Sequence, residues 1–269
     1  MSDTMYLCQT CGTQYPAEVA PPERCPICED DRQYVNRAGQ QWTTLAKLRE
    51  SHTNTLTDLI PGVTMINTTP KAGIGERAYL LQTPAGNLLW DCVAYLDDAT
   101  VAAIRERGGL AAIAISHPHF YTTMVDWSAA FGGIPIYIHA DNHQWVMRPD
   151  PAIHLFESES VEPLPGLRVI RLGGHFPGSA VLHWPAADNG AGALFTGDTI
   201  KVVADARWVT FMYSYPNTIP LGRTAIQRIV AGVEPLTFTR LYDGWDEVIG
   251  DGKRAVLRSA ERYLAHLSE

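Results

Sequence analysis

The sequence contains no apolar run of the roughly 18–20 residues that a membrane-spanning helix requires. Its first residues, Met1 to Met5, lack the basic segment and apolar core of a secretory signal peptide. Positive charge is also scarce, because 21 Lys and Arg residues face 29 Asp and Glu residues, a formal net charge of -8. This balance disfavours nucleic acid and anionic membranes as partners. We therefore expect a globular, cytoplasmic protein with neither kind of partner.

Cysteine is sparse, and four of the five cysteines form two pairs near the start of the chain. Cys8 and Cys11 are separated by two residues, as are Cys25 and Cys28, and 13 residues lie between the pairs. Two such turns can place four thiolates around one tetrahedral metal ion. The alternative is a pair of disulfides, which cytosolic proteins seldom keep. The pattern resembles a zinc ribbon or a short rubredoxin, so we expect zinc, with iron as the other possible metal.

The segment around these cysteines is acidic, with six acidic and three basic residues among residues 1–40. A nucleic-acid-binding ribbon would normally be basic. We therefore interpret the four-cysteine module as structural or as a docking element, and electron transfer would require iron. The fifth cysteine, Cys92, is interpreted as a small buried apolar residue.

Three apolar segments each end in residues that can bind a metal. Leu110 to Ile115 is predicted to be a buried strand that leads into His117 and His119. These two histidines lie two residues apart, so an extended backbone points both side chains to one side. The strand 168–172 leads through Gly173 and Gly174 to His175, and the strand 193–198 ends in Asp198. Imidazole and carboxylate ligands of this kind suit zinc or iron(II).

The order of His-x-His, a later lone His after Gly-Gly, and Thr-Gly-Asp resembles the metallo-β-lactamase-like superfamily over roughly residues 61–250. Leu88 to Asp91 resembles the early strand of that family, which ends in Asp. The resemblance implies an αββα sandwich with a metal site at the edge of its two sheets. It also implies that Asp91 orients a ligand histidine from outside the ligand set. The domain organisation we predict is a four-cysteine module over 1–40, a linker helix within 41–60, and the αββα domain over 61–269.

The sequence departs from the family pattern at the second metal site. Tyr121 and Thr122 stand where the pattern His-x-His-x-Asp-His has Asp and His, and no histidine follows the strand that we predict over 236–242. We therefore expect one metal at this site, held by His117, His119, His175 and Asp198. Asp243, which follows that last strand, is the candidate substitute for the missing histidine.

The aromatic segment from Trp208 to Asn217 carries no charge and follows Asp198 closely. It is either a packed connection to the helix that we predict over 221–230, with a cap near Thr218, or an apolar wall of a pocket. Under the second interpretation Trp208 and Tyr215 line the pocket. We expect the hydroxyl of Tyr121, Tyr213 or Tyr215 to take over part of the second metal's role.

The function that follows as an expectation is metal-dependent hydrolysis, in which a metal-bound hydroxide attacks a small ester, thioester, lactone or lactam. Asp198, Tyr121 and Tyr213 are the predicted catalytic residues, and a small molecule is the predicted substrate. Two alternatives stay open. One is a mononuclear iron enzyme that oxidises thiol-derived or persulfide substrates, and the other is a non-catalytic binding protein of the same fold.

Overall fold

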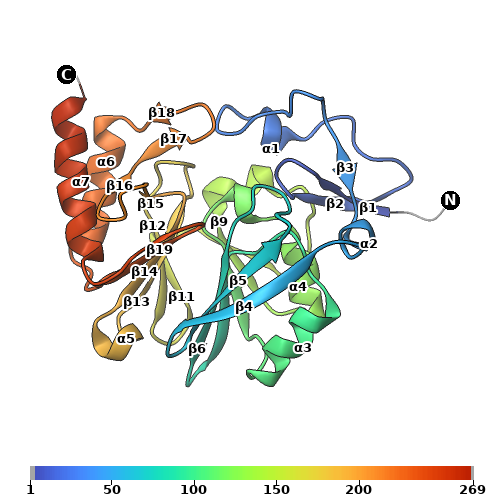
Figure 1. Ribbon diagram of the computed structural model, residues 1–269, viewed down its shortest axis with the longest axis horizontal. Helices are drawn as coiled ribbons and strands as arrows, with labels where there is room; N and C mark the ends of the chain where they lie inside the picture. Colours follow the sequence, from blue (N-terminus) through green and yellow to red (C-terminus); the bar gives the residue numbers. More distant parts are fainter. Residues whose placement is uncertain (1–3, 268–269) are drawn as a thin grey trace.

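The computed structural model describes residues 4–267, and in it two β-sheets pack face to face with helices on their outer faces (Figure 1). The longer helices α6 and α7 cover one sheet, and α3 and α4 cover the other (Figure 1). This is the predicted αββα sandwich, and that prediction is confirmed. Between residues 4 and 267 no helix is both long and apolar enough to cross a membrane.

The first sheet has seven strands in the order β10-β9-β8-β7-β6-β5-β4. Its strands from β4 to β7 are joined in antiparallel fashion, whereas β7, β8, β9 and β10 run parallel. Parallel neighbours need a crossover connection, and helices α3 and α4 provide two of them. The elements are β4 (Thr53–Ile60), β5 (Val63–Thr69), β6 (Ala78–Thr83), β7 (Gly86–Trp90), α3 (Asp98–Glu106), β8 (Ala112–Ala114), α4 (Met124–Ala130), β9 (Ile136–His139) and β10 (Ile153–Phe156).

The second sheet has six strands in the order β11-β12-β13-β14-β19-β20. Strands β14 and β19 are parallel, and α6 lies on the crossover between them. The elements are β11 (Ser160–Leu164), β12 (Leu167–Arg171), β13 (Ala180–Trp184), α5 (Ala187–Gly190), β14 (Ala193–Gly197), α6 (Arg223–Val233), β19 (Arg240–Asp243), β20 (Glu247–Val248) and α7 (Gly252–His266).

The core between the sheets consists of side chains that point inward from both. Tyr79 of the first sheet meets Phe195 of the second, with ring centroids 5.3 Å apart, and both are buried. On the outer faces, α6 buries the apolar stripe Ile226, Ile229 and Val233 at helical spacing. Each layer thus covers an apolar face of the next, which leaves the strand ends free to carry polar residues.

The N-terminal module is a small three-stranded sheet with two short helices, one before and one after its last strand. Its elements are β1 (Thr4–Cys8), β2 (Gln14–Glu18), α1 (Pro26–Glu29), β3 (Trp42–Thr43) and α2 (Leu45–Leu48). The remaining short elements surround the strand ends of the main domain: η1 (Pro118–Phe120), η2 (Ala140–Trp145), β15 (Lys201–Val202), β16 (Val209–Thr210), β17 (Met212–Ser214) and β18 (Ile219–Pro220).

Several predicted boundaries differ from the structure. Residues 53–60, which we assigned to the linker, form β4 and pair along their length with β5. The linker helix occupies only Leu45–Leu48 of the predicted linker, and the side chain of Thr44 caps its start by accepting the backbone N–H of Lys47. Helix α6 begins after Gly222 and not near Thr218, and the strand predicted over 236–242 begins at Arg240. The four-cysteine module also shares a hydrophobic cluster with strands of the first sheet, so it packs as part of the main body.

Candidate metal centre

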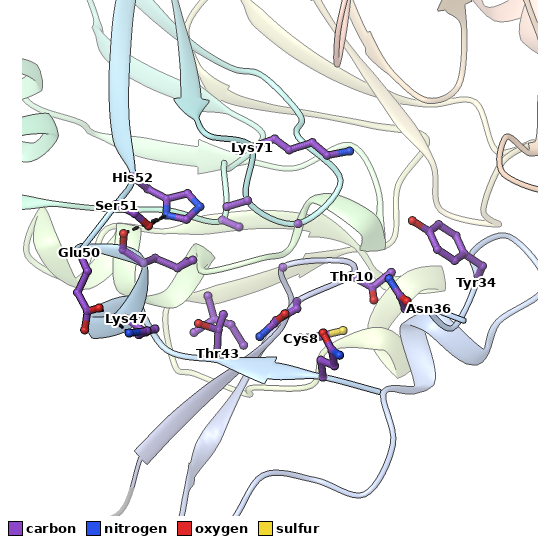
Figure 2. A pocket seen from close by; sticks show the side chains of 18 residues that line it. Cys8, Thr10, Tyr34, Asn36, Thr43, Lys47, Glu50, Ser51, His52 and Lys71 are labelled. Carbon is purple, nitrogen blue, oxygen red and sulfur yellow. Dashed lines mark hydrogen bonds and ion pairs between the residues drawn. The ribbon is translucent and has the colours of Figure 1, made fainter. Parts of the chain in front are cut away.

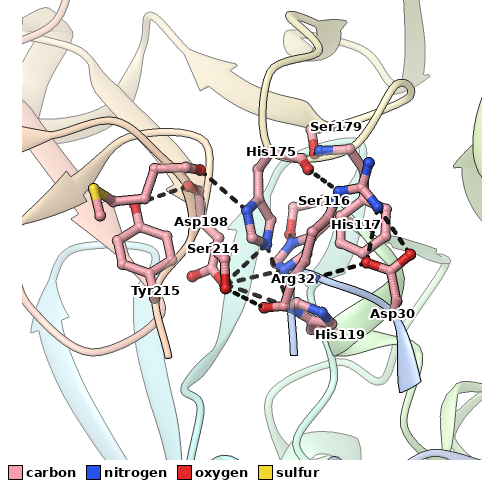
Figure 3. Close-up of polar contacts among 12 residues, drawn as sticks. Asp30, Arg32, Ser116, His117, His119, His175, Ser179, Asp198, Ser214 and Tyr215 are labelled. Carbon is pink, nitrogen blue, oxygen red and sulfur yellow. Dashed lines mark hydrogen bonds and ion pairs between the residues drawn. The ribbon is translucent and has the colours of Figure 1, made fainter. Parts of the chain in front are cut away.

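Three strand ends bring four potential ligands to one point. His117 follows β8, and Pro118 opens the short helix η1 that carries His119. His175 follows β12 through Gly173 and Gly174, whose φ angles of +70° and +87° suit glycine. At Gly174 a Cβ would also lie 2.9 Å from a terminal methyl of Leu221, which would have to shift to make room. Asp198 directly follows β14. Figure 3 shows the imidazoles of these histidines converging on Asp198.

The donor atoms have the spacing of a single metal site. Oδ2 of Asp198 lies 3.2 Å from Nε2 of His117, 3.8 Å from Nδ1 of His119 and 3.5 Å from Nε2 of His175. The two nitrogens of His119 and His175 are 3.3 Å apart. Four donors about 2.0–2.1 Å from a tetrahedral ion would be about 3.3–3.4 Å apart. The four residues can therefore hold one divalent metal.

Burial and charge prepare these groups to bind a cation. None of the four residues exposes more than 3% of its surface. Burial lowers the pKa of His117 and His175, which keeps their rings neutral, as metal binding requires. Burial works against the charge on Asp198, but the imidazoles of His117, His119 and His175 hold the pKa of its carboxyl well below its usual range. The cluster thus combines neutral nitrogen donors with one carboxylate.

A hydrogen-bonded relay fixes the orientation of His117. Asp91, held at φ +59° directly after β7, accepts the backbone N–H of Ser116 at 2.7 Å and its hydroxyl at 3.1 Å. The Ser116 Oγ then lies 2.8 Å from Nδ1 of His117. Since the hydroxyl proton points to Asp91, Oγ accepts the proton of Nδ1, which leaves Nε2 free for a metal. Asp91 therefore acts on the ligand histidine through Ser116.

The ring of His175 is oriented by a backbone carbonyl group. Its Nδ1 lies 3.2 Å from the carbonyl oxygen of Met212, so the proton sits on Nδ1 and Nε2 faces the other ligands. Tyr215 donates its hydroxyl to the backbone carbonyl of Asp198 at 3.0 Å, and its ring centroid is 5.7 Å from that of His175. The strand β17 and the residues after it thus support two of the four ligands.

The four N-terminal cysteines form a second cluster of the same kind. All four are free and buried, with Sγ atoms 3.5 Å apart for Cys8 and Cys28 and 3.6 Å apart for Cys11 and Cys25. A disulfide would require about 2.05 Å, whereas thiolates about 2.3 Å from a tetrahedral ion would be about 3.8 Å apart. The geometry fits a four-thiolate metal cage.

The chain is 48% identical over 266 residues to the uncharacterized protein YmaE of Bacillus subtilis (strain 168), covering 98% of this chain and 97% of that protein. It belongs to the YmaE family. No protein-family model matches the chain. The fold is that of the metallo-β-lactamases, which confirms the predicted resemblance.

Two solved structures illustrate this similarity of fold. The crystal structure of VMB-1 superimposes with a TM-score of 0.58 at 14% identity, covering 79% of this chain and 97% of that one. The metallo-β-lactamase FIM-1 from Pseudomonas aeruginosa, in its mono-zinc form, has a TM-score of 0.56 at 16% identity and covers 78% and 96%.

The other predicted site residues lie elsewhere or in different roles. Tyr121 is buried in the hydrophobic core with its hydroxyl facing Asn142, where burial raises its pKa. Asp243 accepts the backbone N–H groups of Val202, Trp245 and Asp246, so its carboxylate is occupied as a turn cap instead of replacing a histidine ligand.

The aromatic segment is divided between the two interpretations that the sequence left open. Trp208 packs against the guanidinium groups of Arg258 and Arg262 on α7, at 4.9 and 4.0 Å, so its expected place in the pocket wall is wrong. Tyr215, directly after β17, lies beside His175 and Asp198. Tyr213, within β17, instead lies under the guanidinium of Arg32, 4.5 Å from its ring centroid. The segment thus packs against α7 at its start and against the ligands at its end.

Arg32 contacts the histidine centre, and sequence reasoning missed it. Its Nε donates to the backbone carbonyl of His175 at 2.6 Å across 143 positions of sequence. No local pattern marks this arginine, since its partner is a backbone atom of a distant loop. A separate cavity of about 630 Å³ is lined by the N-terminal module, including Cys8 and Lys47, and by His52 and Lys71 (Figure 2). None of the four ligands at the histidine centre lines it.

Proposed function

We propose that this protein is a metal-dependent hydrolase with one divalent ion held by His117, His119, His175 and Asp198. The substrate class we propose is a small ester, thioester, lactone or lactam. The observation that carries the proposal is the convergence of four buried donor atoms from three strand ends at the spacing of a single ion. The fold that the chain shares with the metallo-β-lactamases lends it support.

The metal, when bound, lowers the pKa of a coordinated water toward neutrality and polarises a substrate carbonyl. The chain's own residues prepare the site for it. Asp91 and Ser116 keep a proton on Nδ1 of His117, and the Met212 carbonyl keeps one on Nδ1 of His175. Both rings therefore present Nε2 with its lone pair free. Asp198 supplies the one negative charge among the four ligands.

Three positions support a single metal over a pair. Thr122 donates its hydroxyl to the carbonyl of Cys92, Tyr121 faces Asn142, and Asp243 caps a turn. Thr122 and Asp243 are thus committed to hydrogen bonds within the protein, and the side chain of Tyr121 is buried in the core. The FIM-1 structure in its mono-zinc form is consistent with one ion in this fold.

The surroundings of the ligands favour a small, partly apolar substrate. Phe176 packs edge-on against His119 at 5.0 Å and against His175 at 5.1 Å, and Trp145 packs against Phe176. Tyr215 adds a ring beside His175. Aromatic walls around a few polar groups are typical of small-molecule sites.

The test is the metal content of the purified protein together with a screen of esters, thioesters, lactones and lactams. The wild type is compared with His117→Ala/His119→Ala and with Cys8→Ser/Cys11→Ser. We expect two ions in the wild type, one lost in each variant, and turnover that disappears with the histidines. Iron that disappears with the histidines would instead indicate the oxidising enzyme. Metal binding without turnover of any substrate class would favour the non-catalytic alternative.

A further inference from the structure

The segment from Asp30 to Gln33 connects the four-cysteine cluster to the histidine centre. It begins two residues after Cys28 and lies against the loops that carry and support His175 (Figure 3). The side chain of Arg32 is only 13% exposed, although it lies on a short surface module. A buried arginine needs partners for its charge and its donors, and those partners lie on both sides of the interface.

Arg32 is held by contacts of three kinds. Its Nη1 donates to both carboxylate oxygens of Asp30, at 2.8 and 2.9 Å, and its Nε donates to the carbonyl of His175 at 2.6 Å. The guanidinium lies 4.5 Å from the ring centroids of Phe176 and Tyr213. Charge-assisted hydrogen bonds and stacking of this kind hold a planar guanidinium in one orientation. Arg32 therefore fixes the backbone at His175 from the side of the N-terminal module.

The same segment also holds the loop that orients the His175 ring. The ring depends on the carbonyl of Met212 at the start of β17. Two residues later, Ser214 donates to the carbonyl of Arg32 at 3.2 Å. Asn217 donates to the carbonyls of Asp31 and Gln33, at 3.0 and 3.2 Å. Both the backbone of His175 and the partner of its Nδ1 are thus attached to residues 31–33.

Residues 31–33 are in turn held in place by the cysteine cluster. Cys25 precedes the one-turn helix α1 and Cys28 lies within it. The helix is capped at its end by Asp30, whose N–H donates to the carbonyl of Pro26. Gln33 donates its N–H to the carbonyl of Asp30 and continues the turn. A one-turn helix has little stability by itself, so a metal ion shared with Cys8 and Cys11 would supply its rigidity.

We propose that Arg32 is a positioning residue for the ligand His175, and that metal bound in the four-cysteine cluster governs how tightly the histidine centre holds its own metal. The inference rests on the metal binding in the proposed function, but not on the reaction that follows there. Loss of the metal from the cysteines would loosen residues 30–33, free the His175 carbonyl and release the loop that orients the His175 ring. By linkage, metal in the histidine centre would increase the affinity of the cysteine cluster by the same factor.

The experiment uses the full-length protein loaded with Co²⁺ at both centres. Thiolate-bound cobalt gives strong near-ultraviolet charge-transfer absorption that the histidine centre lacks, so each centre can be followed separately. Arg32→Ala is expected to raise the dissociation constant of the histidine centre about 10–100-fold, the usual effect of removing a partner that orients a ligand. The charge-transfer absorption of the cysteine cluster should not change.

Arg24→Ala is the matched control, because Arg24 lies in the same module but its side chain is 70% exposed and pairs with Glu29 at 3.8 Å. It should leave both dissociation constants at their wild-type values. A dissociation constant of the histidine centre that is unchanged in Arg32→Ala would overturn the role of Arg32. An equal loss of affinity in Arg24→Ala would do the same, since any change in the module would then suffice.

A second measurement tests the coupling without a substitution in the cysteines. A thiol-reactive mercurial removes cobalt from the cysteine cluster of the folded protein, and release from the histidine centre is followed in a chelator. In the wild type we expect this release to become about tenfold faster or more. In Arg32→Ala it should be fast whether or not the cysteines hold metal. If the wild-type release rate is the same with and without metal in the cysteine cluster, the coupling is refuted, whatever reaction the protein catalyses.

Discussion

Replacing Asp91 by asparagine is expected to weaken metal binding at the histidine centre while leaving the fold intact. Asp91 is fully buried at φ +59°, a backbone conformation that asparagine also tolerates. In Asp91→Asn the side-chain carbonyl oxygen can still accept the N–H of Ser116. The new amide group, however, must face the Ser116 hydroxyl, where the wild type has an acceptor 3.1 Å away. The variant thus reverses one hydrogen bond and preserves the volume.

The reversed hydrogen bond changes the proton position on His117. The introduced amide donates to Ser116 Oγ, so the Ser116 hydroxyl proton turns toward Nδ1 of His117, 2.8 Å away. Nδ1 must then accept, and the ring proton moves to Nε2, the atom that faces Asp198. Metal binding has to displace that proton or break the relay. We expect a loss of affinity of about 10–100-fold, which corresponds to about 1.4–2.7 kcal/mol.

The assay is competition for Zn²⁺ against a chromophoric chelator, with thermal unfolding of the metal-free protein measured in parallel. Asp98→Asn is the control, because Asp98 is an exposed carboxylate on α3 without contact to the site. The zinc affinity of Ser116→Ala should lie between those of Asp91→Asn and Asp98→Asn. This substitution removes the group that orients His117 but does not force the ring proton onto Nε2. An unchanged zinc affinity in Asp91→Asn would show that the hydrogen bonds from Asp91 through Ser116 do not determine which nitrogen of His117 carries the proton.

Three further predictions test other parts of the structure. Glu76 is buried, one of its oxygens has no hydrogen-bond partner among residues 4–267, and burial raises its pKa to about 8. Since the folded state therefore binds this proton more tightly than the unfolded state, the wild type loses stability as the pH rises from about 4.5 to 8. Glu76→Gln should be more stable than the wild type by roughly 4 kcal/mol at pH 8 and by little at pH 4.5 in denaturant titrations; an equal difference at both pH values would contradict this. Gly197 has φ +49° and lies against Ser116. Gly197→Ala should therefore lower the free energy of unfolding by at least about 2 kcal/mol and weaken zinc binding; an unchanged stability together with an unchanged zinc affinity would refute the packing argument. Trp208→Ala should lower the free energy of unfolding by about 1–2 kcal/mol, because it removes the contacts to α7, and should leave the zinc affinity unchanged. A loss of zinc binding would show that Trp208 contributes to the metal site.

The local features of both metal clusters follow from the sequence alone. Two Cys-x-x-Cys turns bring thiolates together by their own spacing, and His117 and His119 share a side because they lie two residues apart after a buried strand. The glycines before His175 and the apolar strand before Asp198 are likewise local signals. Strand ends that carry such residues predicted the set of candidate ligands, and the αββα sandwich was predicted from the resemblance of the ordered motifs to the metallo-β-lactamase-like superfamily.

The supporting contacts were decided only by the tertiary structure. Whether Tyr121 faces the ligands or Asn142, and whether Trp208 faces a pocket or α7, depends on side chains that are distant in sequence. The same holds for Asp91, which reaches His117 through Ser116 25 residues away, and for Arg32, which binds a carbonyl 143 residues away. Sequence spacing determines the direction of the backbone over a few residues, whereas the orientation of a buried polar side chain is determined by whichever donor or acceptor the packing places opposite it.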